Sequence, residues 1–222
     1  CGLIVEKYPY YNSKTHKLEY DKLVDFLSQI PEKSAVVLHA CCHNPTGCDL
    51  NLSQWRELSE LFQKRSLVPF FDFAYQGFGK GIEEDSWAIR YFAEQGHDML
   101  VATSFSKNFT LYGERVGCLC VLSKNKQTNQ NVGSLLKQIT RRFYSSPPRH
   151  GAEIVSTILS DFGLKKMWLE ELNEMRNQTE EKRQAFVNAL AAQFGEEKFA
   201  YIKQDQGLFS NLDLTKEQVK RL

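Results

Sequence analysis

Six side chains carry groups that could act together in one small-molecule site. They are a carboxylate, a phenol, an amide, a primary amine, a hydroxyl and a guanidinium, from Asp72, Tyr75, Asn44, Lys107, Ser104 and Arg115. A lysine amine can form an imine with a carbonyl compound and can also act as a general base. A hydroxyl together with an arginine is suited to phosphate, because the guanidinium can donate two parallel hydrogen bonds. The six groups therefore offer imine chemistry and phosphate binding, provided that the fold brings them together.

Apolar runs and amphipathic segments alternate over the first 122 residues, and these elements must position the six side chains. Uninterrupted apolar runs, typical of strands buried on both faces of a sheet, occur at 35–42, 67–72, 98–104 and 116–122. Segments 21–30 and 55–62 carry apolar residues at helical spacing. Ser86 and Gly96 are suited to beginning and ending another helix. This alternation predicts an α/β fold with a mostly parallel sheet flanked by helices on both faces.

The six side chains follow consecutive predicted strands. In parallel sheets, ligands bind at the carboxyl ends of the strands. Each residue also has an ordinary explanation: Asp72 as a cap of the next turn, the Asn44 segment as a plain turn, and Lys107 and Arg115 as solvated surface charges. Their joint occurrence at neighbouring strand ends favours a shared pocket.

The pattern changes beyond about residue 123. A predicted helix over 132–143 is broken by Pro147 and Pro148, and a long charged helix follows over 164–194. The runs 199–202 and 207–212 are interpreted as strands of a smaller unit, and Thr215 with Gln218 forms a capping-box pattern. We therefore expect a large domain over 1–145. Over 146–222 we expect a long connecting helix and part of a smaller α+β domain.

Composition excludes several classes of protein. The 28 basic and 27 acidic residues give a net charge of +1, which provides no electrostatic basis for binding nucleic acid or an anionic membrane. No apolar run approaches the roughly 18 residues of a membrane-spanning helix. Six cysteines among 222 residues are too few for a disulfide framework. These features favour a reducing compartment, and we expect a cytoplasmic protein. No charged-then-apolar leader opens the sequence, so a targeting segment is either absent or already missing.

Cys41, Cys42, His43 and Cys48 form a cluster of residue types that can bind a metal ion. Adjacent residues of a strand point to opposite faces, and the sequence contains no Cys-x-x-Cys pair, so we expect no metal. No glycine-rich dinucleotide motif follows a strand either.

Three segments resemble the aspartate aminotransferases, which are fold type I pyridoxal-phosphate enzymes. They are HACCHNPTG at 39–47, FFDFAYQGF at 70–78, and SFSKNF at 104–109 followed by YGERVG at 112–117. The resemblance covers essentially the whole sequence, and it implies that family members begin upstream of Cys1 and continue past Leu222. It further implies pyridoxal 5'-phosphate as cofactor, amino acids and 2-oxo acids as partners, and a homodimer that shares its active sites.

The resemblance also implies roles for the six side chains. Lys107 matches the lysine that holds the cofactor as an imine and then moves the substrate's α-proton. Asp72 matches the carboxylate that keeps the pyridinium nitrogen protonated. Tyr75 and Asn44 match the groups that hydrogen-bond the phenolic oxygen of the ring, and Asn44 also counts as substrate-binding. The phosphate ligands implied by the resemblance are Ser104 and Arg115.

His39 and Arg141 each have both a functional and a structural interpretation, and the sequence does not decide between them. His39 matches a histidine that supports the carboxylate of Asp72, and it is equally explained as a hydrogen-bonded core histidine. Arg141 matches an arginine that reaches into the partner subunit and binds the distal carboxylate of the substrate. Arg142 leaves that register ambiguous, and both arginines could belong to a solvated helix end. Ser146 departs from the family's usual asparagine.

The resemblance implies amino-group exchange between L-aspartate and 2-oxoglutarate, which yields oxaloacetate and L-glutamate. The segment SFSKNF is closer to the cytosolic branch of the family. The alternative is a truncated or non-catalytic paralogue that serves as a dimerisation or binding module, because the sequence lacks the family's upstream phosphate cradle and downstream carboxylate-binding arginine. The matched positions are intact, which favours the enzyme, although we expect little activity from these 222 residues alone.

Overall fold

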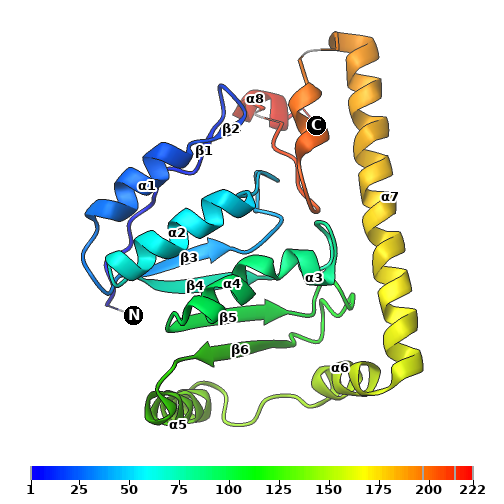
Figure 1. Cartoon of the computed structure of the whole chain (residues 1–222). Helices are drawn as coiled ribbons and strands as arrows, with labels where there is room; N and C mark the ends of the chain where they lie inside the picture. The colour runs from blue at the N-terminus through cyan, green and yellow to red at the C-terminus, as the bar shows by residue number, and fades with distance from the viewer. Residues whose placement is uncertain (1, 197, 213, 222) are drawn as a thin grey trace.

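The computed structural model describes residues 2–196, 198–212 and 214–221 (Figure 1). Its centre is a four-stranded sheet in the order β3-β4-β5-β6. The strands are β3 (Ala35–His39), β4 (Val68–Phe73), β5 (Met99–Ser104) and β6 (Gly117–Leu122). The first three are parallel, and β6 runs antiparallel to β5. This α/β architecture with a mostly parallel sheet confirms the predicted fold class.

Four helices precede or connect these strands: α1 (Tyr20–Gln29), α2 (Leu52–Lys64), α3 (Ile82–Asp85) and α4 (Trp87–Gln95), with a short ribbon of β1 (Tyr11–Asn12) and β2 (Lys17–Leu18) before them. Gly96 ends α4 in the left-handed conformation, with a φ of 78°, as predicted. The prediction for Ser86 is wrong in its detail. Its hydroxyl donates to the carbonyl oxygen of Glu83 (2.9 Å) instead of capping α4, because α3 ends directly before it.

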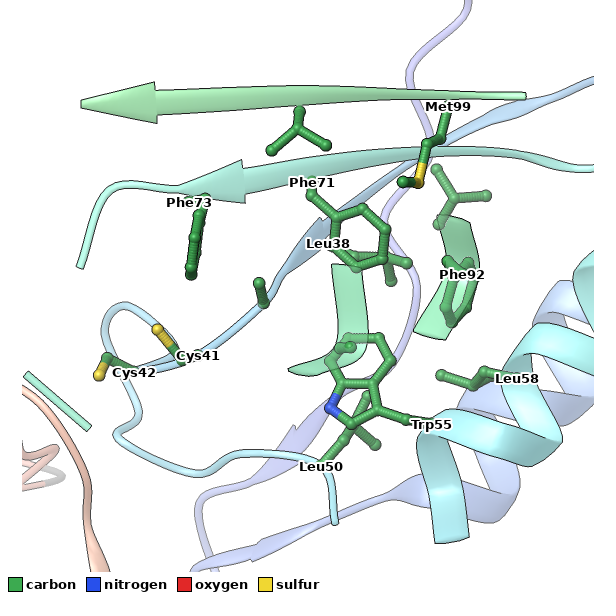
Figure 2. Packing of buried hydrophobic residues seen from close by; sticks show 14 of the residues in the cluster. Leu38, Cys41, Cys42, Leu50, Trp55, Leu58, Phe71, Phe73, Phe92 and Met99 are labelled. Carbon is green, nitrogen blue, oxygen red and sulfur yellow. The ribbon is translucent and has the colours of Figure 1, made fainter. Parts of the chain in front are cut away.

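The core is aromatic, and it lies between the sheet and the helices. Figure 2 shows Trp55 and Leu58 of α2, Phe71 of β4, Phe92 and Met99 facing one another. The ring centroids of Phe71 and Phe92 are 5.3 Å apart in a T-shaped arrangement, and those of Trp55 and Phe71 are 5.9 Å apart. Aromatic pairs of this geometry stabilise a core beyond the burial of their area. The core therefore holds the sheet rigid beneath the loops that follow its strands.

The last third of the chain is helical. Its elements are α5 (Lys126–Phe143), α6 (His150–Ser160), α7 (Phe162–Phe194), the 3-10 helix η1 (Ala200–Gln204) and α8 (Lys216–Val219). The helices expected over 132–143 and 164–194 are confirmed as α5 and α7. The capping box of α8 is confirmed too, since the Gln218 N–H donates to the Thr215 hydroxyl (3.2 Å).

The prediction of two strands near the end of the chain, at 199–202 and 207–212, is wrong. Residues 200–204 form η1, and 207–212 have no regular secondary structure. Backbone groups at the start of the second run bind elsewhere. The N–H of Gln206, just before that run, donates to the Gly47 carbonyl (2.8 Å), and the Arg183 guanidinium donates to the Gly207 carbonyl. A loop and a helix side chain thus replace the strand partner that a sheet would require.

The expected domain boundary after residue 145 falls between α5 and α6 and remains a prediction. Among the described helices, none is both long and apolar enough to cross a bilayer.

Candidate active site

The carboxyl ends of β3, β4 and β5 form one edge of the sheet, here called the carboxyl edge. His39 at the end of β3 is in register with Asp72 on β4. Because β6 is antiparallel, its first residue Gly117 is in register with Ser104 at the end of β5. Arg115, two residues before Gly117, therefore also lies at the carboxyl edge. The orientation of β6 is thus what places the predicted hydroxyl and guanidinium at the same edge.

Three loops at the carboxyl edge bring an amide, a phenol and an amine into contact. The Asn44 side-chain N–H donates to the Tyr75 phenol oxygen at 3.0 Å. The Lys107 Nζ lies 4.7 Å from the centroid of the Tyr75 ring. An ammonium at this distance from an aromatic face is attracted by the ring quadrupole. Three of the predicted site residues, which are 31 and 32 positions apart in sequence, therefore meet around one ring.

Burial raises the pKa of the Tyr75 phenol, and the negative charge of Asp72 raises that pKa further, while the hydrogen bond from Asn44 opposes the shift. The phenol therefore remains protonated at neutral pH. Since its oxygen already accepts from Asn44, its own hydrogen is available to donate to a ligand oxygen.

His39 connects the strand end to the turn that carries Asn44. Its Nδ1 accepts a hydrogen bond from the Asn44 backbone N–H at 3.2 Å. Burial lowers the pKa of His39, and the charge of Asp72 acts in the opposite direction. The ring is therefore a neutral acceptor that fixes the Asn44 backbone, and it lies within the electrostatic influence of Asp72.

The turn at 44–47 is held by groups that the sequence motif did not reveal. The Asp49 carboxylate accepts from the backbone N–H groups of Cys42 (2.7 Å) and His43 (2.8 Å). Gly47 has a φ of 66°, and a side chain there would collide with Asp205. This close approach explains the glycine, because only glycine combines a positive φ with no Cβ at low cost.

Ser104 and Arg115, the predicted phosphate ligands, both lie at the carboxyl edge. The Ser104 hydroxyl accepts from the Ser106 backbone N–H at 3.2 Å. Arg115 adopts a φ of 53° and donates through Nη1 to the Tyr112 carbonyl at 3.1 Å. One guanidinium nitrogen is thus used to orient the side chain, which leaves other donors of the planar group for an anion.

Phe209 is a site residue that the sequence did not indicate. Its ring meets the Tyr75 ring edge-on, with centroids 5.5 Å apart and an interplanar angle of 88°. It reaches the carboxyl edge because 205–210 packs against the turn at 44–47. Tyr75 and Phe209 are 134 residues apart in the sequence, and no local sequence pattern predicts a contact over that separation.

Arg141 and Arg142 lie in the last turn of α5. In Figure 1, α5 lies beside β6, at the end of the sheet opposite to the carboxyl edge. The predicted role of Arg141 across a subunit interface remains a prediction.

Cys41 and Cys42 do not point to opposite faces of a strand, contrary to expectation. Ligand atoms of Cys41, Cys42 and Asp85 lie within 4.8 Å of one another, because β3 ends at His39 and strand alternation does not apply beyond it. The Asp85 oxygens accept backbone N–H groups of Gly77, Gly79 and Lys80. A hydrogen bond with Cys42, and then burial, raise the pKa of Cys41, which keeps that thiol protonated. The absence of a metal remains a prediction.

Comparison with known proteins agrees with this geometry. The whole chain, residues 1–222, matches the family described as aminotransferase class I and II. The chain is 43% identical over 222 residues to the aspartate aminotransferase of Pseudomonas aeruginosa, covering 56% of it. It is 45% identical over 222 residues to the aromatic-amino-acid aminotransferase of Escherichia coli, again covering 56%. All of this chain is covered in both cases, so it spans about half the length of these curated relatives.

Two solved structures of aminotransferases are also similar to this chain. An aromatic-amino-acid aminotransferase from Burkholderia pseudomallei, covalently bound to pyridoxal phosphate, superposes with a TM-score of 0.95 at 44% identity over 99% of this chain and 55% of that one. An aspartate aminotransferase from Trypanosoma cruzi has a TM-score of 0.91 at 42% identity, over 97% of this chain and 55% of that one. The chain therefore belongs to the class I and II aminotransferase family.

Proposed function

We propose that these residues belong to a pyridoxal-phosphate-dependent aminotransferase that exchanges the amino group between L-aspartate and 2-oxoglutarate, giving oxaloacetate and L-glutamate. The observation that carries this proposal is the meeting of Asn44, Tyr75 and Lys107 at the carboxyl edge. The named cofactor of the Burkholderia relative supports it. We further propose a cytoplasmic homodimer. The five cysteines that the structure describes as free thiols are in keeping with a reducing compartment.

The donor set of the carboxyl edge fits this cofactor. Lys107 would bind it covalently through Nζ, and Asp72 would keep its ring nitrogen protonated. Tyr75 and Asn44 would hydrogen-bond the phenolic oxygen, and the phosphate would be bound by Ser104 and Arg115. When bound, pyridoxal phosphate supplies an electron sink for the substrate's α-carbon.

The remaining chemistry belongs to the protein's own side chains. Lys107 would move the α-proton, because its amine is the basic group that reaches over the Tyr75 ring. Tyr75 would donate from a phenol that burial keeps protonated, and Asn44 would hold that phenol in place. His39 would keep the Asn44 backbone fixed as a neutral acceptor. These fixed donors need no reorganisation when charge develops, which is the main source of electrostatic catalysis.

Aromatic amino acids are the second candidate substrates. The observation that favours them is the 45% identity to an aromatic-amino-acid aminotransferase, beside 43% to an aspartate aminotransferase. Overall similarity does not separate the two, so the assignment of a dicarboxylate depends on Arg141.

The experiment that tests the proposed function is mapping of the covalent cofactor bond. Full-length protein loaded with pyridoxal phosphate and reduced with borohydride should carry the pyridoxyl adduct on the peptide containing Lys107. Lys124, which lies just after β6, is the matched control, and Lys124→Ala should leave the adduct unchanged. An adduct confined to Lys124 or to another lysine would overturn the assignment, and no adduct would favour the non-catalytic alternative.

Substrate choice gives a second prediction, at Arg141. Removing one member of a desolvated charge pair costs about 2–5 kcal/mol, or roughly 30-fold to several thousand-fold at about 1.4 kcal/mol per decade. Arg141→Asp in the full-length dimer should reduce kcat/KM for aspartate by this factor. Efficiency toward alanine or phenylalanine should fall much less, because neither carries a distal charge, and cofactor retention should not change.

Arg142→Asp is the control for this prediction, since Arg142 lies beside Arg141 in the same helical turn. Equal losses for aspartate and alanine would show that Arg141 belongs to a solvated helix end. A full-length monomer with normal turnover would contradict both the homodimer and the role of Arg141 across the interface.

A further inference from the structure

We propose that Trp168 of α7 is a positioning residue for Lys107, and that α7 holds the lysine loop and the tyrosine loop of the site in one arrangement. The inference rests on the proposed function, since it assigns a role relative to the amine that would bind the cofactor. Trp168 is 61 residues away from Lys107 in the sequence, and it belongs to a helix with no other assigned task at the site.

The indole of Trp168 contacts both residues that follow Lys107. Its Nε1–H donates to the Asn108 carbonyl oxygen at 2.7 Å. Its ring stacks on Phe109, with centroids 4.5 Å apart and an interplanar angle of 21°. One rigid side chain therefore provides a hydrogen bond to one neighbour of the lysine and an apolar contact to the next.

Asn108 extends this connection to the tyrosine loop. Asn108 is 4% exposed, and its side-chain Nδ2 donates to the Gln76 carbonyl at 3.3 Å. Gln76 follows Tyr75, whose ring lies 4.7 Å from the Lys107 Nζ. The lysine and tyrosine loops are therefore joined through Asn108, and Trp168 holds the backbone of that same residue.

The same face of α7 also presses on the tyrosine loop directly. Leu172, four residues after Trp168 and so on the same helix face, is 1% exposed. A Cβ at Gly77 would lie 2.4 Å from a methyl carbon of Leu172, so the helix packs against the bare backbone there. Figure 1 shows α7 running along the side of the molecule toward which β3 and β5 point. One rigid helix thus supports two of the three loops that form the site.

The expected consequence of losing the indole donor is a misplaced amine in an otherwise folded protein. Trp168→Phe keeps an aromatic ring for Phe109 but removes the hydrogen bond to Asn108. Because a displacement of about 1 Å at a reacting group can cost on the order of 10²-fold, kcat should fall roughly 10- to 100-fold. KM should change little, because the predicted substrate and phosphate contacts are made by other residues.

The test combines activity with one readout that a purely structural residue would not move and one that locates the change in the lysine loop. One is the pH titration of the visible absorbance of the Lys107-bound cofactor in the full-length holoenzyme, whose midpoint should shift in Trp168→Phe. The other is hydrogen exchange of the amides at 106–111, which should be faster in the variant. The matched control is Trp87→Phe on α4, where the indole stacks on Tyr91 with centroids 5.0 Å apart. It should leave the titration midpoint and the exchange at 106–111 unchanged.

The outcomes separate this inference from the proposed function. A wild-type adduct on Lys107 together with an unshifted midpoint in Trp168→Phe would overturn the positioning role alone. Equal shifts in Trp168→Phe and Trp87→Phe would do the same, because the effect would then be general destabilisation. A wild-type adduct on another lysine, or none, would overturn both. If Trp168→Phe also melts far below the control, Trp168→His, whose ring Nε2–H can take the place of the indole Nε1–H, should return the midpoint toward the wild-type value, and failure to do so would count against the inference.

Discussion

Lys107→Ala in the full-length protein should abolish turnover while the protein remains folded. The variant loses the amine that would bind the cofactor and the general base that would move the α-proton. Loss of general-base catalysis alone costs about 10²–10⁴-fold, so we expect kcat to fall by roughly 10⁴-fold or more. Lys107 is only partly buried at a loop, so the melting temperature should stay close to that of the wild type.

Lys107→Arg separates the chemistry of the amine from its charge. Arginine keeps a cation near the face of the Tyr75 ring, but it stays protonated and forms no covalent bond with the cofactor. It should be about as inactive as Lys107→Ala, and kcat, adduct mapping and thermal unfolding would be measured for both. Activity retained in Lys107→Arg would show that the residue contributes only positive charge.

Asp72 is expected to produce the second largest effect. Asp72→Ala removes the carboxylate that would keep the ring nitrogen of the cofactor protonated. Removing one preorganised electrostatic contact costs about 10²–10³-fold, and because the whole electron sink depends on this charge we expect at least the upper end of that range. Asp72→Glu should cost far less, since the charge is retained and only its position changes. Equal losses in the two variants would point to turn capping or packing instead.

The pKa of His39 provides an independent check on Asp72. Burial lowers this pKa, and the negative charge of Asp72 opposes the lowering. Asp72→Ala should therefore lower the pKa of His39 further, whereas Asp72→Glu should leave it closer to the wild-type value. An NMR titration of the imidazole measures this without any cofactor. An unchanged pKa in Asp72→Ala would mean that the carboxylate does not act electrostatically on this edge of the sheet.

Local structure followed largely from local sequence. The apolar runs that became β3, β4 and β5 have no charged residue in their centres, and the strands that they predict are present. Their burial on both faces is not confirmed for β3, where buried residues alternate with exposed ones such as Val37. The capping box at Thr215 and the left-handed Gly96 were recognisable because each involves only a few neighbouring residues. Signals of this kind depend on hydrogen bonds within one turn, so they need no knowledge of the rest of the fold.

The orientation of β6 and the conformation of 199–212 needed the tertiary structure. An apolar run predicts a strand but not its direction, which depends on the connection that precedes it. Residues 200–204 formed the 3-10 helix η1. The Gly207 carbonyl, at the start of the run 207–212, accepts from Arg183 of α7, and Gln206 just before that run donates to Gly47. Strand formation requires a partner with free backbone groups, and a partner's presence is a property of the whole chain.

The sequence by itself determined which six side chains carry the proposed chemistry, because their types and their places after apolar runs can be read directly. Only the tertiary structure decided what surrounds and supports them: Asp49 beneath the turn of Asn44, Phe209 against Tyr75, and Trp168 behind Lys107. These partners lie up to 134 residues away from the groups that they contact, as for Tyr75 and Phe209. Contacts of that range arise when the packed core and the long helix α7 bring distant segments to one edge, and no local pattern of residues records them.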